Sequence, residues 1–144
     1  MTGPIVILGV DYGDVRTGLA VSDPSGLMAF GAGCIRAEGM RKAAEGVARA
    51  AVEKKASLIV IGNPINMNGS LGPRSEKCKA FAEMVTELSG IPAELFDERL
   101  TTVSAHRILS ESNVRGKKRK NAVDELSAQL ILQDYLDSRR NRGL

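Results

Sequence analysis

The chain has 144 residues, of which 43% are hydrophobic and 26% charged, a composition typical of one ordinary globular domain. No apolar run approaches the length of a membrane span, and the N-terminus lacks the features of a signal peptide, so we expect a cytoplasmic protein without a membrane partner. Aromatic residues make up 3%, which argues against base stacking as the main way of binding nucleic acid, whereas the net charge of +3 mildly favours a polyanionic partner.

The segment Ile7–Asp23, ILGVDYGDVRTGLAVSD, predicts a β-hairpin, because an apolar run stops at a carboxylate, turns through glycines and resumes as a second apolar run. Its first strand is Ile5–Val10, and side-chain alternation places Asp11 where an apolar face meets solvent. Arg16, in the turn, could hold an anion there. An alternative of equal weight at this point is that Asp11 and Asp14 are only turn residues.

The middle of the chain predicts alternating strands and helices. A weakly patterned strand is expected around Ala29–Arg36, and apolar residues at helical spacing over Met40–Val52 predict an amphipathic helix that covers a sheet. Leu58–Ile61 predicts a short buried strand. The following helix carries apolar residues over Cys78–Leu88 and ends at Gly90.

A polar loop is expected over Gly62–Pro73, between that strand and that helix. Asn66, Ser70 and nearby backbone N–H groups could contact phosphates at the entrance to the helix. The alternative is a glycine-rich connection that binds no ligand.

Cysteine and histidine offer little catalytic chemistry. Cys34 and Cys78 are isolated, without the paired spacing of a zinc site and too few for a disulfide scaffold, so we interpret them as reduced packing residues. The only histidine, His106, lies inside a predicted helix. Carboxylates are therefore the better catalytic candidates.

Two adjacent carboxylates follow a further predicted strand, Ala93–Phe96, which runs directly into Asp97, Glu98 and Arg99. Because neighbouring side chains point to opposite faces, only one of the two acids can share a face with the acid of the first strand, and alternation does not choose between them. Arg99 could pair with a carboxylate or with substrate.

A basic run, RGKKRK, precedes the last helix. The ordinary interpretation of such a run is a solvated, mobile loop. The alternative is that its side chains neutralise phosphates without recognising a base sequence, so that affinity falls with added salt. The basic residues of this predicted loop are Arg115, Lys117, Lys118, Arg119 and Lys120.

The last helix supplies a third carboxylate. Asp124 shares a helical stripe with Ala128, Ile131 and Tyr135, which are expected to face the sheet. We place Asp124 within the first turn, where the helix dipole favours a negative charge and where ordinary capping is a sufficient explanation for an Asp.

Three carboxylates from the first strand, a later strand end and an inward helix face can converge at one edge of a sheet. Such a cluster suits Mg²⁺ or Mn²⁺, which prefer carboxylate and water oxygens, with phosphate oxygens completing the shell. Two such ions can activate a water and stabilise the leaving oxygen of a phosphodiester.

With these residues in place, the sequence resembles a known family, the YqgF-type proteins, described as Holliday-junction-resolvase-like and as pre-16S rRNA nucleases. Four blocks carry the resemblance, in the family's order and over nearly the whole chain. They are GVDYGDVRTGLAVSD (Gly9–Asp23), GNPINMNGS (Gly62–Ser70), DERLTT (Asp97–Thr102) and VDELSAQLILQDYL (Val123–Leu136).

The resemblance implies a ribonuclease H-like α/β fold, a single domain over residues 1–144 whose mixed β-sheet is opened by the N-terminal hairpin and flanked by helices. It also implies metal-dependent cleavage of nucleic acid, in which Asp11, Glu98 and Asp124 match the family's catalytic and metal-binding acids. The choice of Glu98 rests on the resemblance, with Asp97 as the reserve.

We therefore predict an Mg²⁺- or Mn²⁺-dependent endonuclease that processes the 5′ end of precursor 16S rRNA, with the ribosome as a potential partner. The second block departs from the family pattern, with Asn63 in place of Leu and Asn68 in place of Asp; Asn68 weakens any role in metal binding but keeps hydrogen bonding. The residues expected to contact substrate are Arg16, Asn66, Ser70, Arg99, Thr101, Thr102, Arg115, Lys117, Lys118, Arg119 and Lys120.

Three other functions stay open. A resolvase of four-way DNA junctions fits the same fold but would usually need a dimer, and the sequence leaves the oligomeric state undetermined. A non-catalytic RNA- or ribosome-binding factor would use the basic run and keep the acids only for structure. A sugar-kinase-like phosphotransferase is the weakest candidate, because the second domain of such kinases does not fit this length.

Overall fold

A computed structural model describes residues 5–63, 73–97 and 116–141 of the chain, as five strands and three helices. In chain order these are β1 (Ile7–Asp11), β2 (Arg16–Ser22), β3 (Ala29–Arg36), α1 (Met40–Glu53), β4 (Leu58–Asn63), α2 (Pro73–Ser89), β5 (Ala93–Asp97) and α4 (Gly116–Asn141). The strands form one sheet in the order β3-β2-β1-β4-β5. The β1–β2 and β2–β3 pairs are antiparallel, whereas β1–β4 and β4–β5 are parallel. The predicted mixed α/β sheet, opened by a hairpin, is confirmed.

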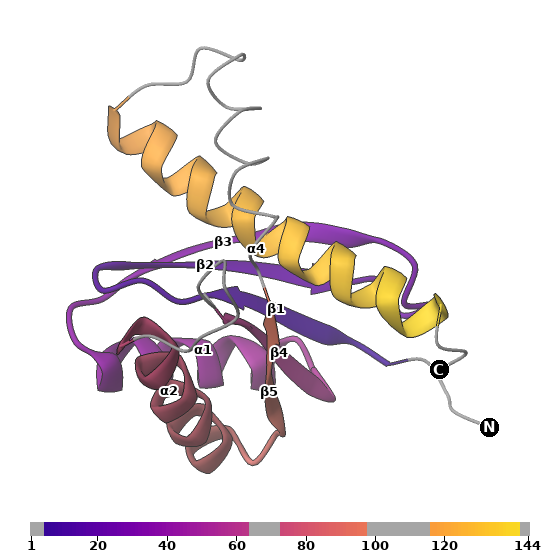
Figure 1. The fold of residues 1–144 in the computed structure, drawn as a ribbon, viewed down its shortest axis with the longest axis horizontal. Coiled ribbons are helices and arrows are strands. Elements are labelled where there is room, and N and C mark those ends of the chain that lie inside the picture. Colours follow the sequence, from indigo (N-terminus) through magenta and orange to yellow (C-terminus); the bar gives the residue numbers. More distant parts are fainter. Residues whose placement is uncertain (1–4, 64–72, 98–115, 142–144) are drawn as a thin grey trace.

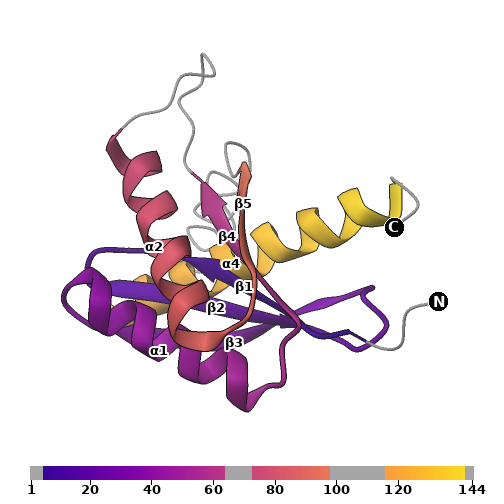
Figure 2. The ribbon, with the colours of Figure 1, turned by 90° about the horizontal axis from the view of Figure 1, so that it is seen from below.

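Helices cover both faces of this sheet, with α4 on one side and α1 and α2 on the other (Figure 1). Seen from below, α1 and α2 lie in front of the strands and α4 crosses behind them (Figure 2). Alternation along β1 divides the core accordingly, since Leu8 and Val10 pack towards α1 and α2 whereas Ile7 packs towards α4. Within the described ranges, no helix is long and apolar enough to cross a membrane.

The start of α4 corrects two predictions. The helix begins at Gly116, so the backbone of residues 116–120 is helical and the predicted basic loop is wrong there. Lys and Arg are good helix formers, and a run of them shows no apolar periodicity by which a helix would be recognised. Asp124 consequently lies about two turns inside the helix and not in its first turn. Its place is explained by the sheet beneath it and not by capping.

The polar connection after β4 is shorter than predicted. β4 continues through Gly62 and Asn63, which pair with Phe96 and Asp97 of β5, so these two residues are strand and not loop. Pro73 already belongs to α2, as expected for a residue whose missing N–H costs nothing at a helix start. Asn66, Asn68 and Ser70 lie outside the described residues.

Helix α4 also covers the outer edge of β3. Glu125 Oε2 accepts the Gly33 N–H at 2.6 Å, and Gln133 Oε1 accepts the Ala29 N–H at 2.9 Å. Gln129 Nε2 donates to the Ala29 carbonyl at 3.1 Å. These side chains occupy backbone groups that an edge strand would otherwise offer to another strand, and they fix α4 along the length of the hairpin.

Candidate functional site

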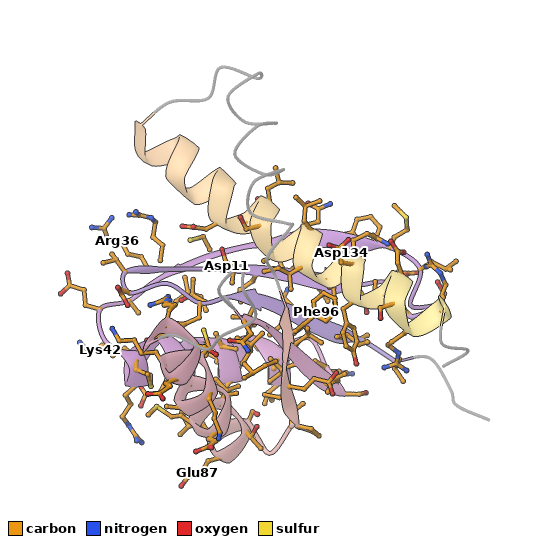
Figure 3. The ribbon with its side chains drawn as sticks, in the orientation of Figure 1. Asp11, Arg36, Lys42, Glu87, Phe96 and Asp134 are labelled. Atoms are coloured by element: carbon orange, nitrogen blue, oxygen red, sulfur yellow. The ribbon has the colours of Figure 1, made fainter. Side chains whose placement is uncertain are left out.

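The carboxyl end of β1 presents Asp11 on the sheet face that α4 covers. Ile7, Gly9 and Asp11 alternate onto this face, and Ile7 is fully buried in the core beneath α4. A Cβ placed on Gly9 would lie 2.7 Å from Leu132 Cβ, so the helix rests directly on the strand. Asp11 is the next residue along this face and is only partly buried (Figure 3).

Gly18 of β2 connects Asp11 to α4. It is the cross-strand partner of Asp11, so both residues belong to the same face of the sheet. A Cβ at Gly18 would lie 1.9 Å from the backbone oxygen of Asp124, which leaves room only for a glycine beneath that turn of α4. The packing of helix on hairpin at this glycine therefore brings Asp124 to the part of the sheet that carries Asp11.

Arg16, at the start of β2, forms an ion pair with Asp124, with 3.3 Å between Nε and Oδ2. Both side chains are 25% exposed, so the pair is partly shielded from water. The Nε atom itself is buried and makes no hydrogen bond of acceptable geometry within the described part of the chain. The contact is a charge pair and not an aligned hydrogen bond, and it places Arg16 beside Asp124.

Residues of β3 also lie on this face of the sheet, beside Arg16 and Gly18. Cys34 pairs with Gly18 and Arg36 pairs with Arg16, so both lie on the α4 face. Partial burial, reinforced by the charge of Asp124, raises the pKa of the Cys34 thiol, while Arg16 opposes that rise. Cys34 is thus a neighbour of the candidate site and not only a packing residue.

Cys78 conforms to the sequence prediction. Its side chain is buried in the core between the sheet and the two helices α1 and α2, on the face opposite the acids. Its side chain packs among apolar side chains.

The ends of β4 and β5 meet at the same edge of the sheet as Asp11. Asn63, at the end of β4, is 8% exposed, and its Oδ1 accepts the Ser75 hydroxyl at 2.7 Å. The Asn at this position therefore fastens the start of α2 to the sheet. On β5, Phe96 packs against Tyr135 of α4 with 5.6 Å between ring centroids, whereas Leu95 packs towards the other core.

The sequence does not indicate a set of contacts that Arg74 makes at the hairpin tip, which we call the Arg74 clamp. Arg74 Nη1 donates to Asp14 Oδ1 at 2.8 Å, and its guanidinium lies 4.8 Å from the centre of the Tyr12 ring and also donates to the Tyr12 carbonyl. The Tyr12 ring stacks on Phe81 with 4.1 Å between centroids. The hydrogen bond and the charge of Arg74, with a smaller contribution from Lys77, hold the pKa of Asp14 below its usual range.

The clamp gives Asp14 a structural role, as the turn-residue interpretation expected. No sequence pattern connects Asp14 with Arg74, because the two residues are 60 positions apart and meet only once the sheet has formed. The one unusual feature in the sequence is that Arg74 is a basic residue in the first turn of a helix.

Several predicted site residues lie outside the described part of the chain. Glu98, Arg99, Thr101, Thr102 and Arg115 lie outside the described residues, and the side chains of Asp97, Lys117, Lys118, Arg119 and Lys120 are likewise outside the description. Among the residues that are described, no three His, Cys, Asp or Glu side chains gather into a metal-binding group. The described site thus consists of Asp11 and Asp124 with Arg16 beside them. Oxygen ligands of this kind suit a hard divalent cation.

Comparisons of sequence agree with the residue blocks. The RuvX family, described as Holliday junction resolvase, matches residues 5–138. A protein of Ruminiclostridium cellulolyticum named "Putative pre-16S rRNA nuclease" is 46% identical over 132 residues, which span 91% of this chain and 93% of that protein. A Clostridioides difficile protein of the same name is 47% identical over 135 residues, spanning 94% and 96%.

Comparisons of structure confirm the predicted ribonuclease H-like fold. Thermus thermophilus RuvC in complex with a Holliday junction matches with a TM-score of 0.57 over 94% of this chain and 96% of that chain, at 13% identity. A Fowlpox virus resolvase in complex with Holliday junction DNA matches with a TM-score of 0.56 over 93% and 98%, at 11% identity. At such identities the likeness is one of fold alone. On the sequence matches, the chain belongs to the RuvX family and is a nuclease, a hydrolase that acts on phosphodiester bonds.

Proposed function

We propose that this protein is a cytoplasmic, divalent-metal-dependent endonuclease, folded as one domain, that processes the 5′ end of precursor 16S rRNA. The names of the relatives that share 46% and 47% identity support the substrate. The observation that supports the mechanism is the position of Gly18, which is the cross-strand partner of Asp11 and lies directly beneath the backbone of Asp124 in α4.

Asp11 and Asp124 are the proposed metal ligands, and Glu98 is the proposed third. Phe96 packs against Tyr135 of α4, whereas Glu98 lies outside the described residues, so the choice of Glu98 over Asp97 rests on the resemblance to the family. Bound Mg²⁺ or Mn²⁺ would supply a water of lowered pKa and positive charge beside the scissile phosphate. Carboxylate oxygens are the donor set that such ions prefer.

Arg16 is the proposed phosphate-binding residue among those described. Its guanidinium is held next to Asp124, so a phosphate at the acids would also be within reach of a planar donor. The remaining proposed contacts rest on the sequence. They are Asn66, Ser70, Arg99, Thr101, Thr102, Arg115, Lys117, Lys118, Arg119 and Lys120.

Cleavage by matched variants tests the proposal. The substrates are a precursor 16S rRNA fragment that spans the mature 5′ end and a synthetic four-way DNA junction, each with Mg²⁺, Mn²⁺ or a chelator. We expect Asp11→Asn and Asp124→Asn to cut neither substrate while remaining folded, because each exchange is nearly isosteric but removes an anionic ligand. Asp134→Asn is the control, since Asp134 is an exposed acid of the same helix (Figure 3). Full activity of Asp11→Asn would contradict the mechanism.

The family description favours one second candidate, a resolvase of four-way junctions. Cutting of the DNA junction alone would support it, and such an enzyme would be expected to form a dimer in order to cut two strands. If neither substrate is cut with either metal, although RNA binds with salt-sensitive affinity, a non-catalytic RNA- or ribosome-binding role is favoured instead.

A further inference from the structure

Arg36, the last residue of β3, lies directly opposite Arg16 of β2 in the antiparallel register. Directly opposed residues share a face of the sheet, and Arg16 reaches Asp124 of α4. Arg36 therefore projects on the α4 side, where Figure 3 labels it beyond the end of the hairpin strands. No sequence motif marked this residue, and the register alone connects it to the site.

Arg16 and Arg36 differ in whether a carboxylate neutralises their charge. Like charges directly opposite each other on two strands destabilise the sheet. Arg16 has Asp124 as a counter-charge, whereas Arg36 is exposed and, within the part of the chain that is described, has no carboxylate at ion-pair distance. Of these two opposed guanidinium groups, Arg16 is thus paired with a carboxylate and Arg36 is not, within the described part of the chain. An additional anion would relieve the repulsion.

We propose that Arg36 and Arg16 together bind one backbone phosphate of the nucleic-acid substrate, so that the strand passes from the acids across the end of β2 and β3. Guanidinium groups bind phosphate through paired, charge-assisted hydrogen bonds. A contact of this kind fixes the position of the strand and carries no base specificity. The inference rests on the proposed nuclease function for its substrate but concerns binding, which can be measured apart from cleavage.

The test is equilibrium binding of a labelled precursor 16S rRNA fragment and of a four-way DNA junction by the full chain. It uses an Asp11→Asn background with chelator, so that no cleavage takes place, over a series of salt concentrations. We expect Arg36→Gln to weaken binding about 3- to 10-fold at low salt and to reduce the slope of log affinity against log salt by about one phosphate contact. Arg49→Gln is the matched control, because Arg49 is exposed on α1, on the other side of the sheet.

Arg36→Lys keeps the charge without the planar fork, and we expect it to restore the salt slope with only part of the affinity. Equal affinities and slopes for Arg36→Gln and Arg49→Gln would overturn the inference. The cleavage assay tests the nuclease proposal separately from the binding assay. If wild-type protein cuts neither substrate with metal but Arg36→Gln still weakens binding, the phosphate site stands without the nuclease. If wild type cuts normally and Arg36→Gln binds as wild type does, only the proposed phosphate site is contradicted.

Discussion

Arg16 and Asp124 connect the beginning of β2 to the third turn of α4 through a contact of 3.3 Å between Nε and Oδ2. A helix that crosses a sheet can slide or rotate upon it, and this pair, together with the close approach at Gly18, fixes the helix where Asp124 stands among the site residues. The Arg16 guanidinium also pairs with the carboxylate of Asp124, which the proposed metal would need as a ligand. Arg16 is thereby placed to compete with a divalent cation for Asp124.

Removal of that competitor should strengthen metal binding. Two unit charges 4 Å apart attract each other by about 1 kcal/mol in water and more when partly shielded. We expect Arg16→Gln to lower the dissociation constant for Mn²⁺ about 3- to 10-fold in titration calorimetry without nucleic acid, while cleavage falls. Arg140→Gln, which breaks the Arg140–Asp137 pair near the other end of α4, is the control. Unchanged Mn²⁺ affinity in Arg16→Gln would mean that the pair and the metal do not share Asp124.

Because Gly18 lies so close to α4, adding one methyl group there should lower both stability and activity. In Gly18→Ala the new Cβ would meet the Asp124 backbone oxygen at 1.9 Å, and backbone cannot turn aside as a flexible side chain can. We expect a loss of about 1–3 kcal/mol in the free energy of unfolding by urea titration, together with loss of activity. In Gly46→Ala, the control, the atoms nearest the new Cβ are side-chain atoms of Ile35 at 3.1 Å, which can move aside, and helix propensity offsets the crowding. Equal stabilities of the two variants would refute the close packing of α4.

The sequence predicts the hairpin and the position of Asp11 because these depend on local patterns, namely an alternating apolar run and a glycine turn. The beginning of α4 could not be predicted in the same way, since RGKKRK has no apolar face and helical structure there carries no periodic signal. Glu125 lies off the apolar stripe of α4 that carries Ala128, Ile131 and Tyr135, so its position in the sequence does not indicate a contact with the sheet. It binds the Gly33 N–H at 2.6 Å in space left open by Gly31, and nothing in the sequence indicates that two glycines and a distant acid meet.

The Arg74 clamp at the hairpin tip should contribute measurably to stability. Its guanidinium combines a hydrogen bond to Asp14, one to the Tyr12 carbonyl and a contact with the Tyr12 ring. Exposed ion pairs alone contribute about 0.2–1 kcal/mol, and the ring contact adds about 0.5–1 kcal/mol. We expect Arg74→Ala to lower the free energy of unfolding by about 1–2 kcal/mol in urea, and Lys79→Ala, an exposed control on α2, to change it little. No difference between them would show that the clamp contributes nothing.

The turn between β2 and β3 predicts a specific pH dependence. Asp23 accepts the N–H groups of Leu27 and Met28, each at 2.9 Å, and these bonds with the Ser25 hydroxyl lower its pKa to about 2. Because this pKa lies below the usual value of 3.8, the carboxylate stabilises the fold fully above about pH 4 and progressively less as pH falls towards 2. Asp23→Asn should therefore be less stable than wild type near neutrality, and the difference in urea midpoint should shrink across that window.

Carboxyl titration by NMR checks the assignment directly and supplies an internal control. Asp134 should titrate above its usual range, because desolvation and the neighbouring charge of Asp137 both raise its pKa. Two aspartates of one protein are thus expected to shift in opposite directions for separate physical reasons. An Asp23 that titrates near 3.8 would show that the turn does not depend on its carboxylate. The gap in stability between wild type and Asp23→Asn should then stay constant down to pH 2, since no proton uptake would be coupled to loss of the turn.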